Sequence, residues 1–511
     1  MVFTSIFPAL GLLAVILIAF CLTKLAAFLH NRHVYWKKSG VPYVQGVPFY
    51  GSAWRLVLRL ETFVDHLTSI YNSHPNARYV GAMDFSIPAI LIRDPELVRE
   101  LGVKYFEHFP DHRSVPNEEM DPIFGKNVFS LTGDRWKEMR NTLSPFFTSS
   151  KMKFMFGLVS KCSEDFFEYL YHHPDLCSMV DAKEFLRRFT NDVIATSAFG
   201  ISVNSLKDRD NEFYKAGDHI TKNVATFRFF KFLMFYLFPR FCRRLGFTFF
   251  SKSTMSFLQG VIADTVKARE EQGIVRPDMI HLLLEAKGKK LSKEMTIDDI
   301  VAQAAIFFLA GYDTVSSAMS FLTYELAVNP EIQRKLREEV DRYLAEENGG
   351  ISYDALAKME YMEMVISETL RMYPVVVIID RVCAERFDLP SAAPGYKGVT
   401  VQPGTSVWYP SYAFHHDPKY FPEPEKFIPE RFNEKNKTNI VPYTYIPFGV
   451  GPRMCIGNRF ALMEVKIMMV SLLRRFVIVP NEKTKPLVFK KNSFQLIPVD
   501  GIWFTLKKRD L

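Results

Sequence analysis

The fold of this chain can be inferred outward from ten residues, Phe448-Gly449-Val450-Gly451-Pro452-Arg453-Met454-Cys455-Ile456-Gly457. Three glycines in this run predict a loop whose backbone takes up positive φ and passes close to a flat ligand. From Asn458 onward apolar residues recur at helical spacing, which places the Cys455 thiol just before a helix N-terminus, where the thiolate form is favoured. An isolated cysteine is more often a small buried hydrophobe, so the loop by itself leaves both interpretations open.

The ten residues fit the pattern Phe-x-x-Gly-x-Arg-x-Cys-x-Gly and resemble the haem-binding loop of the cytochrome P450 family. The resemblance implies that Cys455 is the axial ligand of the iron in haem b, with Phe448, Arg453 and Gly457 among the cofactor-binding residues. It also implies a mainly α fold with small β-sheets (α+β), built as one large haem domain. The narrower likeness is to microsomal insect P450 monooxygenases that metabolise xenobiotics.

Composition sets the broad class of the protein. The 511 residues are 48% hydrophobic and 23% charged, as in an ordinary globular protein, and the 46 phenylalanines favour cavities for flat, lipophilic ligands. A net charge of +8 without long basic runs argues against a nucleic-acid partner and suits an acidic protein or an anionic membrane. The six cysteines are scattered without a C-x-x-C pair, which favours a reducing compartment over a disulfide framework or a zinc site. They are Cys21, Cys162, Cys177, Cys242, Cys383 and Cys455.

The N-terminal segment is predicted to be a membrane anchor. Residues 2–23 carry no charge, and a helix of that length reaches about 33 Å, enough to cross a hydrocarbon core of about 30 Å. A cleaved signal peptide is the alternative, but no basic residue precedes Lys24. Basic residues follow the apolar run, so we expect the remaining chain on the cytosolic face of the endoplasmic reticulum membrane. The expected parts are an anchor (1–24), a basic, Pro/Gly-rich linker (25–51) and a catalytic domain (52–511).

Three further segments have distinct patterns. Residues 79–92 predict a small sheet, since Val and Ile recur in short β-like runs. Residues 106–129 are irregular and polar, and by position resemble the loop that roofs the substrate pocket. Residues 227–250 interleave ten phenylalanines with basic residues, and Pro239 is expected to interrupt a helix there. This mixture is typical of a membrane-contacting segment, although an ordinary buried helix pair fits as well.

A capping box at Thr296 predicts a long apolar helix that continues to about Val328. Its middle carries Ala310-Gly311-Tyr312-Asp313-Thr314, where a glycine makes room for a small molecule and a threonine hydroxyl can bond the carbonyl four residues back. An acid beside an alcohol can deliver protons without flooding a site with water. The resemblance implies that Asp313 and Thr314 are the catalytic acid and alcohol and that Ala310 and Gly311 border the oxygen site. A helix kink at Thr314 and an ion pair at Asp313 remain compatible structural readings.

Three arginines are implied partners of the two haem propionates. Trp136 and Arg140 stand at i and i+4 of a helix and can therefore address one group. Arg381 follows a β-branched run from Val375 to Ile379 that predicts a strand. Arg453 is the third arginine of this set.

A scaffold and a C-terminal hairpin complete the expected site. Glu368 and Arg371 are spaced i and i+3 among apolar neighbours, and with Arg431 they resemble the Glu-Arg-Arg network beneath the haem. A helix is expected to begin at Asn329-Pro330-Glu331, and residues 493–503 are expected to form a hairpin.

The resemblance implies a monooxygenase that inserts one oxygen atom of O2 into a lipophilic small molecule, such as a plant toxin or an insecticide, and releases water. No Gly-x-Gly-x-x-Gly fingerprint appears in a strand-to-helix context, so the NADPH electrons are expected from a separate flavoprotein, NADPH-cytochrome P450 reductase, with cytochrome b5 as a further candidate partner. Arg135, Lys137 and Arg459 are candidate docking charges for it. The alternatives are a steroid, hormone or fatty-acid hydroxylase, a haem-thiolate isomerase or dehydratase, and a non-catalytic haem or lipid-binding protein.

Overall fold

The computed structural model describes residues 19–20, 23–24, 26–113, 118, 121, 123–226, 234, 238–248, 252–273, 276, 278–287 and 295–509. The expected anchor (1–24) lies almost wholly outside these residues, as does much of 227–250. The chain divides into two compact units. The first unit comprises Met1–Phe109 and Ile378–Pro410, and the second comprises Pro110–Val377 and Ser411–Leu511.

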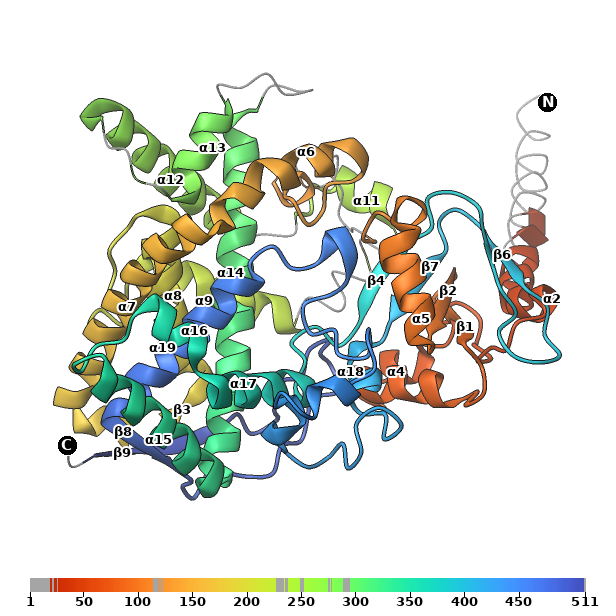
Figure 1. Cartoon of the computed structure of the whole chain (residues 1–511). Coiled ribbons are helices and arrows are strands. Elements are labelled where there is room, and N and C mark those ends of the chain that lie inside the picture. The colour runs from red at the N-terminus through yellow and green to blue at the C-terminus, as the bar shows by residue number, and fades with distance from the viewer. Residues whose placement is uncertain are drawn as a thin grey trace, which may run out of the picture. The chain divides into compact units, whose positions relative to one another are not determined.

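The first unit is built on a four-stranded sheet of order β1-β2-β7-β4 (Figure 1). Strands β1 and β2 are antiparallel, β2 and β7 are parallel, and β4 and β7 are antiparallel. This arrangement confirms the sheet predicted over residues 79–92. The elements of this unit are α2 (Tyr35–Ser39), α3 (Trp54–Val57), α4 (Phe63–Asn72), β1 (Tyr79–Asp84), β2 (Ile87–Ile92), α5 (Pro95–Arg99), β4 (Ile379–Val382), β5 (Phe387–Leu389), β6 (Val399–Val401) and β7 (Ser406–Tyr409).

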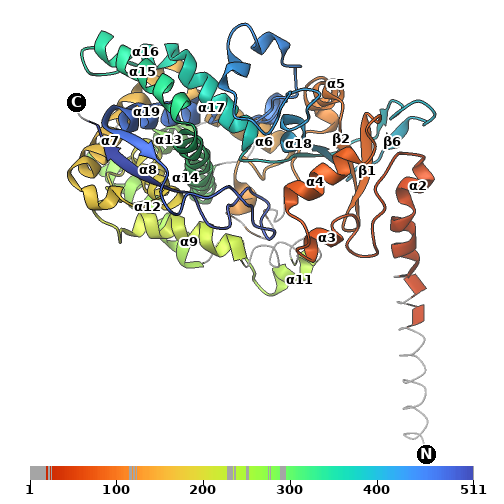
Figure 2. The same cartoon turned by 90° about the horizontal axis from the view of Figure 1, so that it is seen from below.

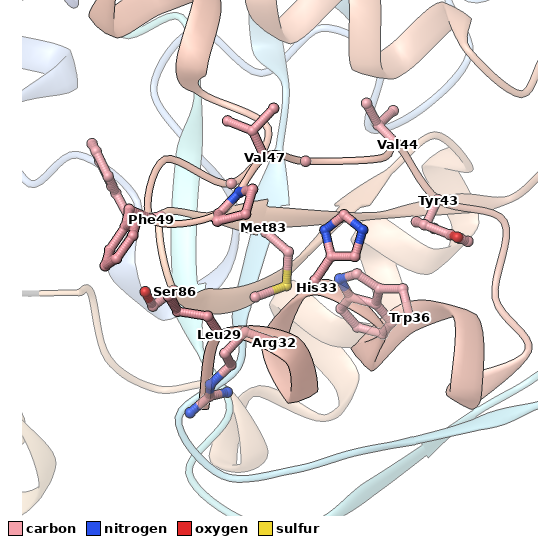
Figure 3. A pocket seen from close by; sticks show the side chains of 14 residues that line it. Leu29, Arg32, His33, Trp36, Tyr43, Val44, Val47, Phe49, Met83 and Ser86 are labelled. Atoms are coloured by element: carbon pink, nitrogen blue, oxygen red, sulfur yellow. The ribbon is translucent and has the colours of Figure 1, made fainter. Parts of the chain in front are cut away.

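The chain before α3 packs against β1. The Trp36 indole donates a hydrogen bond to the Ala82 carbonyl at 2.6 Å, and the Gly81 amide donates to the Pro42 carbonyl at 2.8 Å. A Cβ at Gly81 would meet the Trp36 ring at 2.7 Å, so the close packing needs glycine. Figure 3 shows side chains around a pocket between this segment and the hairpin of β1 and β2. Its volume of about 20 Å³ suits a single water molecule and excludes a substrate.

The second unit is built around the 32-residue helix α14 (Figure 2). Thr296 accepts from the Asp299 amide while Asp299 accepts from the Thr296 amide, so the predicted capping box is present and the helix ends at Val328 as expected. Among the described residues, α14 is the one helix long and apolar enough to cross a membrane. It contacts α8, α9, α17 and α19, which makes it a core helix of this unit.

Other helices of the second unit surround α14. Their bounds are α6 (Gly133–Leu143), α7 (Ser149–His172), α8 (Ala182–Ile194), α9 (Glu212–Thr226), α11 (Pro239–Arg244), α12 (Lys252–Gln272), α13 (Met279–Lys287), α15 (Pro330–Glu346), α16 (Tyr353–Lys358), α17 (Glu360–Met372), α18 (Ser411–His415) and α19 (Asn458–Arg475). A three-stranded sheet of order β3-β9-β8 joins β3 (Val180–Asp181), β8 (Phe476–Val479) and β9 (Trp503–Lys508). The helices predicted to begin near Pro330 and Asn458 are therefore confirmed.

Three local predictions hold in part. The strand expected over 375–379 begins only at Ile379, because cross-strand pairing with β7 starts at Ile379 opposite Tyr409. A hairpin is present near the C-terminus but lies slightly earlier than 493–503: Phe489 and Pro498 form an antiparallel bridge, and β9 begins at Trp503. Pro239 follows the non-helical Phe238 and starts α11, because a missing amide costs nothing at the first position of a helix.

Candidate functional site

Two of the three glycines in the Cys455 loop have the positive φ that the sequence predicts, whereas Gly457 has φ of −95°. Gly449 and Gly451 have φ of 84° and 67°, backbone angles that residues bearing a Cβ rarely adopt. The Cys455 amide donates to the Phe448 carbonyl at 2.8 Å and closes the loop. Helix α19 begins three residues after the cysteine, at Asn458.

Opposing influences act on the pKa of the Cys455 thiol. Burial raises the pKa of the thiol, whereas a hydrogen bond donated by the Gly457 amide and the charge of Arg140 both act to lower that pKa. The residue nevertheless keeps an exposed surface. A bound metal ion would add a much larger charge than either neighbour and would favour the thiolate. The sulfur is therefore accessible and surrounded by groups that tolerate negative charge.

Trp136 and Arg140 both contact the cysteine loop from α6. The Arg453 guanidinium lies 4.0 Å from the Trp136 ring centroid, and an Arg140 Nη2–H donates to the Met454 carbonyl at 2.9 Å. The i,i+4 spacing thus brings both side chains to the cysteine loop, where they contact neighbouring residues; their role toward a haem propionate stays a prediction.

Arg453 is held by protein groups on several sides. Its guanidinium donates to the Pro110 carbonyl at 2.8 Å, to the Leu131 carbonyl at 2.8 Å and to an Asp111 carboxylate oxygen at 2.7 Å. These bonds tie the segments around residues 110 and 131 to the cysteine loop. The geometry favours a role in shaping the loop, beside any interaction with a propionate.

The middle of α14 carries an accessible strip although the helix belongs to the core. Ala310 is exposed and Thr314 is half-buried, whereas Tyr312 and Val315 are buried. The Thr314 hydroxyl donates to the Ala310 carbonyl at 2.6 Å, which is the back-bonded arrangement expected from the sequence. A Cβ at Gly311 would meet Ile194 of α8 at 3.0 Å, so glycine here permits close helix packing.

Asp313 lies in an ion-pair cluster with two residues of α8. Its carboxylate accepts from Arg187 Nη2 at 2.7 Å and lies 3.0 Å from Lys183 Nζ. Burial acts to raise the pKa of Asp313, but the two cations outweigh it and hold that pKa well below its usual range. Burial lowers the pKa of Lys183 to about 8. Lys183 also donates to the hydroxyls of Ser316 at 3.0 Å and Ser317 at 2.5 Å.

Glu368, Arg371 and Arg431 form one buried network. Arg371 makes two bonds to the Glu368 carboxylate, at 2.8 and 2.9 Å, and both residues are 0% exposed. Arg431 Nε lies 3.3 Å from the same carboxylate. Arg371 also donates to the His415 carbonyl, and the Ile446 amide donates to His415 Nε2. The network therefore anchors α17 to the segment that leads into the cysteine loop.

The residues of the second unit fit a thiolate-bound haem. Cys455 is accessible at the start of α19, Ala310 opens the middle of α14, and Arg140 supplies a charge beside the loop. Arg381, the third expected propionate partner, lies in β4 of the first unit and is 0% exposed.

Several residues of this site were not identified from the sequence. Lys183 and Arg187 were missed, although their i,i+4 spacing on an amphipathic helix was a weak signal of a shared partner. Asp111 and His415 were missed because their partners are more than 30 residues away in the chain.

Comparison with known proteins agrees with this geometry. The sequence profile of the family described as Cytochrome P450 matches residues 56–503. The chain is 45% identical to "Cytochrome P450 9e2" of Blattella germanica, with 94% of each chain covered. It is 37% identical to "Probable cytochrome P450 9f2" of Drosophila melanogaster, covering 96% of this chain and 99% of the relative. It is 36% identical to "Cytochrome P450 6j1" of Blattella germanica, covering 94% and 95%. With its cysteine loop, accessible core helix and buried Glu-Arg network, this chain belongs to the cytochrome P450 family, whose members are haem-thiolate monooxygenases.

Proposed function

We propose that this monooxygenase oxidises lipophilic xenobiotics, such as plant toxins or insecticides, with NADPH electrons supplied by NADPH-cytochrome P450 reductase. The observation that carries the proposal is the accessible strip at Ala310 and Thr314 with the Asp313 cluster one residue away. A haem-thiolate isomerase or dehydratase needs no proton relay for the reduction of dioxygen. A non-catalytic haem protein needs no such relay either.

Haem, when bound through Cys455, supplies an iron centre that binds and activates dioxygen. The protein's task beside it is to position a substrate, exclude water and deliver protons. The Thr314 hydroxyl, held by the Ala310 carbonyl, is fixed on the accessible strip. Trp136, Arg140 and Arg453 fix the loop that carries the sulfur.

Protons would reach Thr314 from the Asp313 cluster. Because two cations hold Asp313 ionised, its carboxylate works as an acceptor and a positioning group more than as a stored acid. Lys183 has a pKa of about 8, so it can both hold and release a proton near neutral pH. The Asp313 carboxylate would accept a proton from Lys183, 3.0 Å away, and then turn toward the strip to pass it on to the Thr314 hydroxyl.

The part of 227–250 that is described suits membrane contact. Phe238, Phe241, Leu245 and Phe247 are 53%, 52%, 54% and 42% exposed, and Arg244 is exposed among them. Large apolar side chains that cluster at a surface with basic residues favour lipid as the partner. With the expected anchor at 1–24 and linker at 25–51, this patch would hold the catalytic domain (52–511) on the cytosolic face of the endoplasmic reticulum membrane.

The docking charges differ in their partners. The exposed Arg459 guanidinium donates to the Phe147 carbonyl and the Ser149 hydroxyl, whereas Arg135 is paired with the carboxylates of Glu118 and Asp299. Arg459 is therefore the better candidate for an acidic reductase or for cytochrome b5. Lys137 lies 3.9 Å from the exposed Asp134.

The test is product mass spectrometry under isotopically heavy dioxygen. Membranes that contain the protein and its reductase are given NADPH and a panel of plant toxins, insecticides, fatty acids and steroids. Gain of one heavy oxygen atom in several unrelated toxins supports the proposal. Oxidation of a single steroid or fatty acid favours the endogenous hydroxylase, and rearrangement without NADPH favours an isomerase.

A further inference from the structure

A cleft of about 590 Å³ lies at the C-terminal end of α14, in the second unit. Its volume falls within the range of pockets that hold small organic ligands. The lining is rich in rings and also carries carboxylates. The residues are Tyr324, Glu325, Val328, Asn329, Met372, Tyr373, Tyr412, His416, Glu425, Lys426, Phe427, Ile428, Pro486, Leu487 and Phe489. None of them belongs to the site described above, and α14 runs past that site before it reaches the cleft.

Glu325 is the central polar group of this cleft, and it is only 4% exposed. One carboxylate oxygen accepts from the Tyr373 hydroxyl at 2.6 Å, and the other accepts from Asn329 Nδ2 at 2.8 Å. Both bonds are donated to the carboxylate, which fixes its plane at the cleft wall.

Among the described residues, no basic side chain lies within ion-pair distance of Glu325. Burial raises the pKa of Glu325. Arg371 is the cation whose charge acts to lower that pKa, but its guanidinium is bound to Glu368 and to the carbonyls of His415 and Pro424. Lys426, which lines the cleft, is 67% exposed and pairs with Glu423 at 2.5 Å. A buried carboxylate without a cation is costly, and a bound cation would remove that cost.

The rings of the cleft suit the same kind of ligand. Tyr373 stacks on Phe321 with ring centroids 4.5 Å apart, and Tyr412 stacks on His416 at 4.0 Å. Burial lowers the pKa of His416 to about 4, so this ring is neutral at physiological pH and does not repel a cation. Aromatic faces attract organic cations, most strongly where water is excluded.

We propose that this cleft is a second ligand site, separate from the haem site, that binds an organic cation such as a protonated or quaternary amine. The charged nitrogen lies against Glu325 and the apolar part of the ligand lies among Tyr324, Phe427 and Phe489. The site depends on the charge of Glu325 and on an open cleft mouth.

Benzyltrimethylammonium chloride is the probe, because its nitrogen has no lone pair and cannot ligate the haem iron. Its binding to the full-length holoenzyme in detergent is measured by calorimetry, with and without saturating imidazole on the iron. We expect equal binding in both conditions and an unchanged haem absorption spectrum. Glu325→Gln should weaken binding at least about fivefold, in the range of measured effects for close charge pairs. Benzyl alcohol, the neutral control, should bind at least about fivefold more weakly than the cation.

Two variants keep the test independent of folding. Val328→Trp adds a ring at the cleft mouth, where Val328 is 41% exposed, and should abolish binding without touching Glu325. Glu338→Gln removes a 59% exposed carboxylate outside the cleft and should leave binding unchanged. Full binding by Glu325→Gln or Val328→Trp, equal binding of benzyl alcohol, or loss of binding in the imidazole complex would each overturn the proposal.

Discussion

Replacing Asp313 by Asn tests the charge cluster of α14 and α8. The carboxylate pairs with Lys183 and Arg187, and the three side chains are 14%, 29% and 18% exposed. Asparagine leaves Lys183 without its ion-pair partner and leaves Arg187 with Asp218, which lies 4.0 Å away. Breaking a fully buried pair costs about 3–5 kcal/mol, and the partial exposure of Lys183 reduces this to about 2–4 kcal/mol of unfolding free energy.

A second substitution separates stability from catalysis. Lys183→Met removes one uncompensated cation, so in the Asp313→Asn background it should restore about 1–2 kcal/mol of unfolding free energy. Product formation should stay slow in the double variant, because the carboxylate is still missing. Unfolding in urea is followed by tryptophan fluorescence, and product is measured per NADPH consumed. Asp165→Asn, on the exposed pair with Lys161, is the matched control.

Two results would refute this reasoning. If Asp313→Asn changes the unfolding free energy by less than about 0.5 kcal/mol, the cluster does not have the charges assigned to it. If the double variant recovers full product formation, Asp313 has no part in proton delivery.

Three other predictions follow from the same contacts. Thr314→Ala removes the hydroxyl held by Ala310 and should raise NADPH consumption per product several-fold; unchanged coupling would take Thr314 out of proton delivery. Burial disfavours the charged form of Lys183 in the folded state, so the folded protein loses this proton at a lower pH than the unfolded chain does. The unfolding free energy should therefore rise from about pH 8 to pH 10. Product per NADPH should fall over the same range. Lys183→Arg keeps the charge but cannot release a proton, so product per NADPH should be low and independent of pH over this range; a pH profile identical to that of the wild type would contradict the assignment. Glu368→Gln leaves Arg371 buried without its anion and should cost about 3–5 kcal/mol of unfolding free energy with loss of bound haem, whereas Glu338→Gln should change neither.

Local patterns predicted the parts of the fold that local physics determines. The capping box at Thr296 and the apolar run after it gave α14 its correct start and its end at Val328. The i,i+3 spacing of Glu368 and Arg371 matched the buried pair, because a helix fixes that geometry by itself. The β-branched run at 375–379 predicted a strand that starts too early. A strand also needs a partner, and β7 pairs with this segment only from Ile379 onward.

Contacts between distant segments explain what the sequence did not reveal. Lys183 and Asp313 are 130 residues apart, so nothing near either residue in the chain marks the pair. The bonds from Arg453 to Pro110 and Leu131 depend on backbone carbonyls, which every residue has and no sequence pattern displays. The cleft around Glu325 is lined by five separate segments of the chain, and the Glu325 carboxylate appeared in the sequence as one acid in an apolar helix.

The carbon monoxide spectrum of the reduced protein tests the central assignment most directly. The wild-type protein and Cys383→Ala should both give the thiolate-type spectrum, because burial raises the pKa of the Cys383 thiol to about 11 and keeps it protonated. Cys455→Ala should lose that spectrum. A thiolate-type spectrum that survives in Cys455→Ala would contradict the assignment of Cys455 as the haem ligand.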